Sequence, residues 1–229
     1  HVGDGSPSDY SNVPVDVQGL SSGVRMVSAG SETTCFVLVD GTVRCMGGNS
    51  WGTIGDGTRD ARPTPVEVTG IGAKVSAVSA GGSTTCALTV AGAVKCWGSS
   101  DGLVTSSTPQ TVPGLDHGVV SLGAGWEDTC VVMNDGSVKC WGRNAEGAVG
   151  TGTTGGPVST PSNVSGIPGT VVGVTLAAYS ACALTSTGDL YCWGYGALGG
   201  LGTGDVDVAL TPVQVTGLSV HSDGDGALS

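Results

Sequence analysis

Basic side chains are scarce in this chain of 229 residues, which has 8 Lys and Arg against 19 Asp and Glu and a formal net charge of −11. Such a charge repels a phosphate backbone, and the sequence contains no basic stripe that would overcome the repulsion. Long apolar runs are also missing, because none approaches the roughly 18 to 20 residues that span a bilayer. We therefore expect neither a nucleic-acid partner nor a membrane span.

Residues suited to catalysis are equally sparse. The 3 histidines, His1, His117 and His221, fall in loop or terminal contexts, where a solvated histidine is the ordinary interpretation. The sequence has no Gly-x-Ser-x-Gly elbow, no His-Glu-x-x-His and no Gly-Lys-Ser/Thr after its Gly-rich loops. The chain is thus predicted not to be an enzyme. Because neither an initiator Met nor a signal peptide precedes His1, we expect a processed product or a fragment of a longer protein.

Cysteine and glycine, by contrast, are abundant and regularly placed. Four hairpin-like segments, at 34–47, 85–98, 129–142 and 181–194, each carry two cysteines ten residues apart. The pairs are Cys35/Cys45, Cys86/Cys96, Cys130/Cys140 and Cys182/Cys192. In each segment the residue midway between the cysteines is followed by glycine, at Gly41, Gly92, Gly136 and Gly188. This regularity indicates one repeated local structure.

The glycine defines the geometry of each segment. A three-residue hairpin loop made of a type I turn and a left-handed residue favours Gly in its third position, and Val39-Asp40-Gly41 fits that loop. Counting back along both arms then places Cys35 directly opposite Cys45, within disulfide reach. Zinc or redox chemistry is the weaker alternative, since there is no Cys-x-x-Cys and no histidine at ligand spacing. We predict four cross-strand disulfides.

Each predicted disulfide closes a loop of about eleven residues, which contributes roughly 2.5 to 3 kcal/mol by the loop-entropy formula. Four such bonds would rival the stability of a whole domain, about 5 to 15 kcal/mol. Disulfides persist only in an oxidising compartment, so the sequence favours an extracellular or periplasmic location.

Two further blocks accompany every hairpin. A short apolar strand precedes it, as in "VRMVSAG" and "VSAVSAG", and a Gly-rich block follows it, as in "GTIGDGTRDARPTPVEVTGI". The second copy of the Gly-rich block is shortened to "SSTPQTVPGL", and the chain opens inside a fifth copy, "HVGDGSPSDYSNVPVDVQGL". Each unit therefore contains about four short strands and no amphipathic helix.

The order "VSAG…TCAL…G.VKCWG…G.VGTG…P..V.G" resembles the regulator of chromosome condensation repeat, over nearly all of residues 1–218. The resemblance implies an all-β fold, a β-propeller with one four-stranded blade per repeat, and leaves 219–229 as a C-terminal tail. It also implies that the tryptophan of each Trp-Gly step packs between blades. Trp97, Trp141 and Trp193 match that position, and Met46 replaces the tryptophan in the first copy. Cysteine pairs are not general in the family, which suggests a secreted branch.

About 4.5 repeats do not close the ring that the family forms, usually with seven blades. Residues beyond the sequence, another chain through swapping or head-to-tail assembly, or a compact five-bladed ring would each resolve the unpaired edges. The resemblance covers scaffold residues only, so no nucleotide-exchange activity is carried over.

Trp51, Trp126 and Tyr195 are the candidate binding residues. Each occupies a connecting segment, and at the positions of Trp51 and Trp126 the other copies carry small or polar residues. Exposed aromatic rings anchor protein partners or sugars, although packing between blades would explain them as well. No cofactor is predicted. Calcium is a minor alternative at Gly55-Asp56-Gly57, "GDVDV" from Gly204 and "SDGDG" from Ser222, where Asp and Gly ordinarily make turns.

The sequence thus favours a non-enzymatic secreted recognition or assembly module. It would bind protein partners and associate with copies of itself, as an oligomer or a filament. The alternatives are a lectin-like carbohydrate binder and a propeller-type inhibitor of an extracellular enzyme. Asn163-Val164-Ser165 is a glycosylation sequon if the source modifies secreted proteins.

Overall fold

The structure is a computed structural model, and it describes residues 3–5, 10–100, 104–204 and 207–217. The C-terminal tail predicted at 219–229 and the acidic segment "SDGDG" lie outside these residues. Within them the protein is built from β-strands, with one short 3-10 turn at Ala197–Gly199 and no α-helix. No helix in this part of the chain has the length and apolarity needed to cross a membrane.

In the described residues, sixteen strands form four sheets of four antiparallel strands each, which we call blades 1 to 4. Blade 1 contains β1 (Val24–Ala29), β2 (Thr33–Leu38), β3 (Val43–Gly47) and β4 (Arg62–Glu67). Blade 2 contains β5 (Val75–Ala80), β6 (Thr84–Thr89), β7 (Val94–Ser100) and β8 (Val104–Thr111). Blade 3 contains β9 (Val119–Ala124), β10 (Asp128–Met133), β11 (Val138–Asn144) and β12 (Gly155–Val164). Blade 4 contains β13 (Val171–Leu176), β14 (Ser180–Thr185), β15 (Leu190–Gly194) and β16 (Ala209–Gln214).

The central hairpin of each blade forms as the glycine spacing predicts. In blade 1 the Gly41 N–H donates to the Leu38 carbonyl and the Leu38 N–H donates to the Thr42 carbonyl, both at 2.9 Å. Gly41 has a φ of 85°, in the left-handed region where a side chain would be strained. Asp40 completes the turn, because its Oδ1 accepts a hydrogen bond from the Thr42 N–H. The turn sets the register that pairs Cys35 with Cys45.

Four disulfides join the cysteines that the sequence pairs. They are Cys35–Cys45, Cys86–Cys96, Cys130–Cys140 and Cys182–Cys192. In each bond the Cα atoms lie 4.1 Å apart, close to the separation of directly opposed residues in a non-hydrogen-bonded pair. No cysteine is free. The bonds are consistent with an oxidising, extracellular environment.

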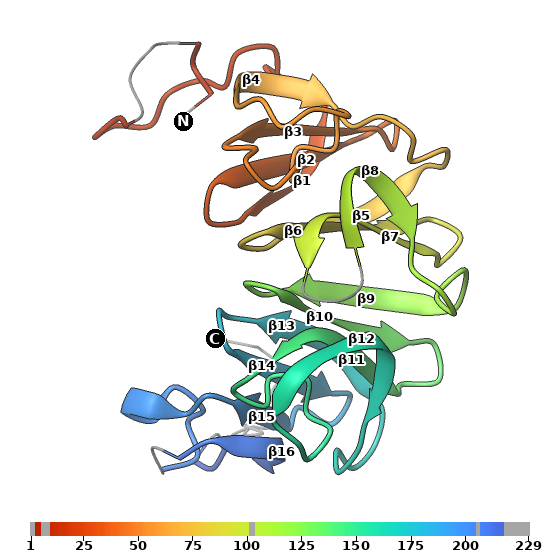
Figure 1. Cartoon of the computed structure of the whole chain (residues 1–229), viewed down its shortest axis with the longest axis vertical. Helices are drawn as coiled ribbons and strands as arrows, with labels where there is room; N and C mark the ends of the chain where they lie inside the picture. The colour runs from red at the N-terminus through yellow and green to blue at the C-terminus, as the bar shows by residue number, and fades with distance from the viewer. Residues whose placement is uncertain (1–2, 6–9, 101–103, 205–206, 218–229) are drawn as a thin grey trace, which may run out of the picture.

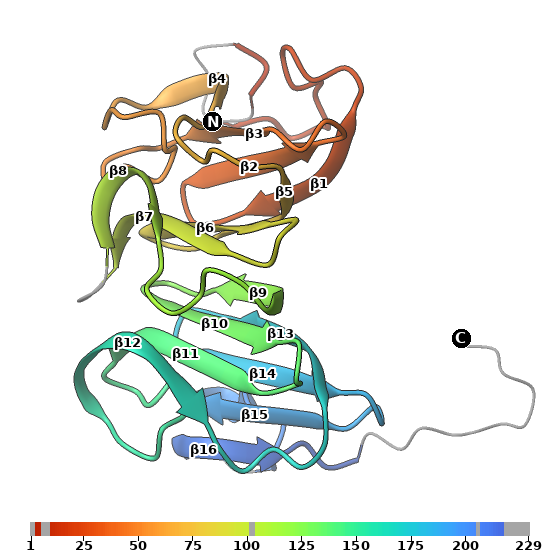
Figure 2. The same cartoon turned by 90° about the vertical axis from the view of Figure 1, so that its right-hand side faces the viewer.

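The blades follow one another along an arc, with their first strands innermost (Figures 1 and 2). β1 contacts β5, β5 contacts β9, and β9 contacts β13. β4, β8, β12 and β16 form the outer edges of the sheets. This is the arrangement of a β-propeller, but the ring is not closed.

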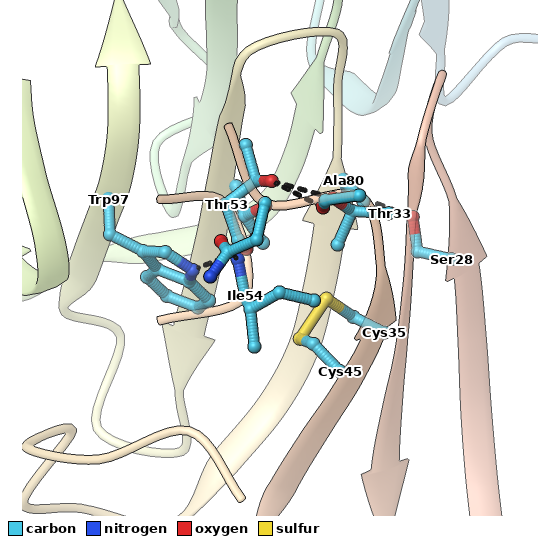
Figure 3. The surroundings of a disulfide bond; sticks show 11 residues. Ser28, Thr33, Cys35, Cys45, Thr53, Ile54, Ala80 and Trp97 are labelled. Atoms are coloured by element: carbon cyan, nitrogen blue, oxygen red, sulfur yellow. Dashed lines mark hydrogen bonds between the residues drawn. A yellow bond between two sulfur atoms is a disulfide. The ribbon is translucent and has the colours of Figure 1, made fainter. Parts of the chain in front are cut away.

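At each junction the disulfide of one blade and the tryptophan of the next belong to the same buried apolar cluster. Figure 3 shows this junction between blades 1 and 2, where Trp97 and the Cys35–Cys45 bond flank Ile54. The Trp97 indole N–H donates to the Thr53 carbonyl of blade 1 at 2.8 Å. Trp193 makes the equivalent bond to the Ala148 carbonyl of blade 3, also at 2.8 Å. Both rings are fully buried, as the family resemblance implies.

Met46, which replaces the tryptophan in the first copy, is covered in the same way. The Gly55 Cα lies so close to the Trp97 ring that a Cβ would come within 2.7 Å of the indole nitrogen. Gly3 is at the equivalent place in the N-terminal block, and a Cβ there would come within 2.5 Å of the Met46 sulfur. The N-terminal block therefore occupies on blade 1 the place that the Gly-rich block of blade 1 occupies on blade 2.

Glycines at the inner ends of the first strands permit the blades to approach closely. A Cβ on Gly30 would collide with the Gly81 carbonyl oxygen, and one on Gly81 with the Gly125 carbonyl oxygen. The Ser28 hydroxyl accepts a hydrogen bond from the Ala80 N–H across the same junction, at 3.0 Å (Figure 3). This explains why the apolar strand before each of the first three hairpins ends in glycine.

The two outer blades each keep one face uncovered. On blade 4, Leu184 is 43% exposed, whereas its equivalents Val37, Leu88 and Val132 are buried. On blade 1, Val27 is 58% exposed, whereas its equivalent Val78 is buried. These faces correspond to the unpaired blade faces that the repeat count predicts.

Candidate functional site

Because the strands of every blade are antiparallel, the connections lie on two opposite sides of the arc, at the two ends of the strands. One end, which we call the aromatic end, collects the turns between first and second strands and the loops between third and fourth strands. Its described segments are 30–32, 48–61, 81–83, 125–127, 145–154, 177–179, 195–204 and 207–208. The other end, the hairpin end, collects the glycine turns and the links between blades. Its segments are 39–42, 68–74, 90–93, 112–118, 134–137, 165–170 and 186–189.

All three candidate binding residues lie at the aromatic end and are exposed. Trp51 is 52% exposed in the loop between β3 and β4, and Trp126 is 43% exposed in the turn between β9 and β10. Tyr195, in the loop after β15, is 48% exposed. The three rings thus differ from Trp97, Trp141 and Trp193, which are buried between blades.

Trp51 and Trp126 line one small pocket, although they come from blades 1 and 3. The pocket has a volume of about 100 Å³, and its wall includes the carboxylate-bearing Glu32 and Glu127. Blade 2 contributes only Gly82 and Ser83. A Cβ on Gly82 would come within 2.8 Å of the Trp126 ring, so the absence of a side chain there leaves room for the indole against the backbone of blade 2.

Tyr195 belongs to a second aromatic group on the same end. Its ring packs edge-on against Tyr179, with centroids 6.5 Å apart. The Arg143 guanidinium lies over the Tyr179 ring, 5.2 Å from its centroid, at cation–π distance. Arg143 also forms ion pairs with Glu146 at 3.1 Å and with Glu127 at 3.6 Å. Hydrogen bonding to Glu146 is the main cause that raises the pKa of Arg143. Glu127 therefore connects this group to the Trp51–Trp126 pocket.

Sequence reasoning did not find Glu32, Glu127, Arg143 and Tyr179. A usable signal existed, because Glu32, Glu127 and Tyr179 occupy the same position of the repeat, three residues before the first cysteine. The second copy has Ser83 there. Large polar or aromatic side chains at one turn position in three of the four copies mark this turn as a candidate binding surface.

Asp128, next to Glu127, is a buried carboxyl group. Its side chain is 2% exposed, and its Oδ2 has no hydrogen-bond partner among the described residues. Burial is the main cause that raises the pKa of Asp128 to about 7. The equivalent Thr84 also has a buried hydroxyl for which the described part of the chain offers no partner, whereas the Thr33 hydroxyl bonds to the Gly48 carbonyl at 2.9 Å. This position of the repeat is therefore buried in blades 1, 2 and 3.

The hairpin end carries two related cavities. One, between blades 1 and 2, has a volume of about 590 Å³ and includes Asp40, Ile71 and Lys74 in its lining. The other, between blades 3 and 4, has a volume of about 270 Å³ and includes Asp135 and Ile167. Each is formed by a glycine turn and the link to the next blade, so the repeat itself generates them.

The acidic turns considered for calcium serve as turns where the structure describes them. The Asp56 Oδ1 accepts hydrogen bonds from the Thr58 N–H at 2.9 Å and from its hydroxyl at 2.8 Å, and Oδ2 pairs with Arg62. Partial burial acts to raise the pKa of Asp56, but the bonds from Thr58 and Arg62 outweigh it and lower the pKa. In the "GDVDV" segment, 205–206 fall outside the described residues. The described residues contain no group of three or more His, Cys, Asp or Glu placed to hold a metal ion.

Of the three histidines, only His117 falls within the described residues. It lies in the link between blades 2 and 3, with its Nδ1 3.1 Å from the Asp116 carboxylate. Both side chains are largely exposed. This arrangement is that of a solvated surface pair.

Two models of the regulator of chromosome condensation (RCC1) repeat match the sequence. One matches residues 40–88, 135–184 and 187–222, and the other matches 24–52, 119–148 and 171–199. The matched segments together cover more than half of the chain.

Solved structures show the same fold. Human WBSCR16 superposes with a TM-score of 0.82 at 22% identity, over 94% of this chain and 60% of that one. Yeast RCC1 (Prp20), solved bound to Kap60, superposes with a TM-score of 0.74 at 18% identity, over 86% of this chain and 49% of that one. A second structure of Saccharomyces cerevisiae Prp20p gives the same TM-score and identity, over 86% of this chain and 51% of that one. The chain thus spans about half to three fifths of these propellers.

Proposed function

Because this chain belongs to the regulator of chromosome condensation (RCC1) repeat family, we propose that it is a non-enzymatic protein-recognition module that acts outside the reducing cytosol. One observation carries the proposal. Exposed aromatic side chains gather at the aromatic end, on connections that the rigid blades hold in place. Rings such as Trp51 and Trp126 are the residues that most often dominate binding energy in protein interfaces.

The solved relatives support a protein partner without identifying it. The yeast protein was solved in complex with Kap60, and its binding to Gsp1p and histones is described with the second structure. This chain shares 18% identity with it and spans about half its length. We therefore infer for this chain only the type of function, a propeller whose surface binds proteins, and not the same partners.

An extracellular or periplasmic site of action rests on the disulfides. Four cross-strand bonds would be reduced in the cytosol, and the hairpins would lose the stabilisation that they give.

A mutational capture experiment tests the recognition function. Wild-type protein and a Trp51→Ala/Trp126→Ala/Tyr195→Ala variant are immobilised and exposed to the proteins of the extracellular milieu. We expect one or more proteins to be retained by the wild type and lost by the variant. A Val39→Ala/Val90→Ala variant is the control, because both valines are exposed at the hairpin end. Identical retention by the aromatic-end variant and the wild type would refute the function. Recovery of an extracellular enzyme would favour the inhibitor alternative.

Self-association forms part of the proposal and rests on the uncovered blade faces. Leu184 on blade 4 and Val27 on blade 1 are exposed where their equivalents are buried by a neighbouring blade. Head-to-tail contact between two copies would bury both faces in the geometry of the internal junctions. We expect the native, non-reduced protein to have a mass above that of one chain, and Leu184→Asp to lower it. A strictly monomeric wild type would end this part of the proposal.

Carbohydrate binding is the second candidate, and the cavities of the hairpin end favour it. Pockets that enclose small ligands have volumes of about 300 to 1000 Å³, and the cavity lined by Asp40, Ile71 and Lys74 has about 590 Å³. A blank glycan array, together with no thermal protection by carbohydrates, would dismiss this candidate.

A further inference from the structure

The pocket between Trp51 and Trp126 is not explained by the packing of the blades. Its two tryptophans are exposed, and neither belongs to the buried junctions between blades. The pocket lies where turns from blades 1, 2 and 3 meet at the aromatic end. Its two exposed rings are therefore open to a group from a partner.

We propose that this pocket takes an arginine side chain of the protein partner, stacked on Trp51 or Trp126 and paired with Glu32. The inference rests on the recognition function proposed above and states the chemistry that the partner must present. Size, charge and an internal example of the same contact carry it.

The small volume of the pocket favours a single side chain over a free ligand. A volume of about 100 Å³ is well below the roughly 300 to 1000 Å³ of pockets that enclose small molecules. A sugar ring or a cofactor would project from it, whereas the flat head of one side chain would be surrounded on several sides.

Charge selects a cation. Glu32 and Glu127 both line the pocket. The negative charge of Glu127 is partly neutralised by Arg143, which also forms an ion pair with Glu146. Among the described residues, no ion pair involves Glu32. Its side chain lies over Gly48, where a Cβ would come within 2.6 Å of Oε2, so the glycine leaves room for the carboxylate beside the pocket. The net charge of −11 adds a long-range attraction for a basic partner.

The protein contains its own example of this contact. On the same end, Arg143 lies over the Tyr179 ring at 5.2 Å and pairs with Glu127 and Glu146. That group consists of an aromatic face, carboxylates and a guanidinium. The Trp51–Trp126 pocket supplies the aromatic faces and the carboxylates, and only the cation is missing from the set.

Arginine fits this set better than lysine does. A planar guanidinium stacks on an aromatic ring and donates two parallel hydrogen bonds to a carboxylate, whereas an ammonium is a strongly hydrated point charge. Indole is also the best of the aromatic faces for a cation.

Indole NMR signals test the proposal in the intact, oxidised protein. The probe is a blocked peptide, Gly-Ser-Gly-Arg-Gly-Ser-Gly, and its partner contains citrulline, a neutral isostere, in place of arginine. We expect the arginine peptide to shift the N–H signals of Trp51 and Trp126, which Trp51→Phe and Trp126→Phe assign. Trp97, Trp141 and Trp193 are buried between blades and serve as internal controls, with no shift expected.

The affinities then separate charge from shape. We expect the citrulline peptide to bind about fivefold more weakly or worse, which corresponds to the loss of roughly 1 kcal/mol of cation–π energy. Glu32→Gln should weaken the arginine peptide to a similar degree. Glu67→Gln is the matched control, since it removes the same charge from an exposed residue at the opposite end of blade 1 and should change the affinity less than about twofold.

Three results would overturn the proposal: no indole shift at saturating peptide, equal binding of the citrulline peptide, or an unchanged affinity in Glu32→Gln. A shift caused by a neutral oligosaccharide but not by the arginine peptide would assign the pocket to carbohydrate. The recognition function fails separately, because it is refuted only when the aromatic-end variant retains the same proteins as the wild type.

Discussion

Blades 2 and 4 present the same disulfide face in two different surroundings. Leu88, beside the Cys86–Cys96 bond, is buried against blade 3, whereas the equivalent Leu184 is 43% exposed. The strand register around both bonds is nevertheless the same, with each cysteine opposite its partner. The repeat therefore carries its own local structure, and the neighbouring blade adds only the burial, as in repeat proteins whose stability is a sum of unit and interface contributions.

Deleting the disulfides of blades 2 and 4 should have the largest effect on the free energy of unfolding. Comparing the two deletions should separate the stability of the single blade from that of its interface with the next blade. Both bonds close loops with a sequence separation of 10, so each pair of Cys→Ala changes loses about 2.5 to 3 kcal/mol of loop entropy. The Cys86/Cys96 pair also loses two buried side chains, whereas in blade 4 only Cys192 is buried and Cys182 is partly exposed, so the blade 2 deletion costs roughly 1 kcal/mol more. We expect urea unfolding to show the larger loss for blade 2. Equal losses would show that the covering blade adds nothing at this position.

The carboxyl group of Asp128 should give the next largest effect, as a dependence of stability on pH. Burial raises the pKa of Asp128 from 3.8 to about 7, so between these values the folded protein holds a proton that the unfolded chain has released. Raising the pH from about 4 to 7 should therefore lower the free energy of unfolding, by about 3 to 4 kcal/mol from this group. The stabilisation is complete at the acidic end of the window and lost through pH 7.

Asp128→Asn is the matched variant, since it keeps the shape and cannot ionise. We expect it to abolish this fall while leaving the rest of the pH profile in place. The equivalent Ser180 in blade 4 is only half-buried and neutral, so Ser180→Ala should leave the profile unchanged. A wild type and an Asp128→Asn variant with parallel profiles would contradict the assignment.

Local features of the sequence were enough to predict the hairpins. The left-handed glycine at Gly41 and the opposed cysteines Cys35 and Cys45 act within one turn, so their geometry follows from residue spacing alone. The propeller arrangement came from the family resemblance, because residues such as Trp97 acquire their role only when the next blade is present. Its bond to the Thr53 carbonyl joins two repeats.

The candidate site was predictable only in part. Trp51 and Trp126 stood out because they interrupt the repeat, but their meeting depends on three blades and on Gly82, which leaves room for the Trp126 ring. The Arg143–Tyr179 contact likewise joins blades 3 and 4. Contacts between residues far apart in sequence follow from the curvature of the arc, which no single repeat encodes.

Truncating the equivalent leucines should have an intermediate effect. Leu88→Ala removes a buried side chain and should cost about 2 to 4 kcal/mol, while Leu184→Ala removes a half-exposed one and should cost less than about 1 kcal/mol. Denaturant midpoints of the non-reduced proteins measure both. If blade 4 is covered in solution by a second copy, the cost of Leu184→Ala should rise with protein concentration. A concentration-independent cost as large as that of Leu88→Ala would contradict the structure of blade 4.

The glycine turns should give the smallest contrast. Gly136 in blade 3 and Gly188 in blade 4 both have positive φ, 81° and 87°, so alanine at either position costs about 1 to 2 kcal/mol of backbone strain. At Gly136 the new Cβ would also lie 2.5 Å from the Thr170 methyl group of the link to blade 4, which adds roughly 1 kcal/mol as that link shifts. Gly188 is exposed, and no described blade follows it.

Ser137→Ala, next to Gly136, should be nearly neutral, because it removes only an exposed hydroxyl that bonds to Asp135. Thermal unfolding of the three variants measures the contrast, and an equal loss at Gly136 and Ser137 would show that the turn does not need its left-handed residue.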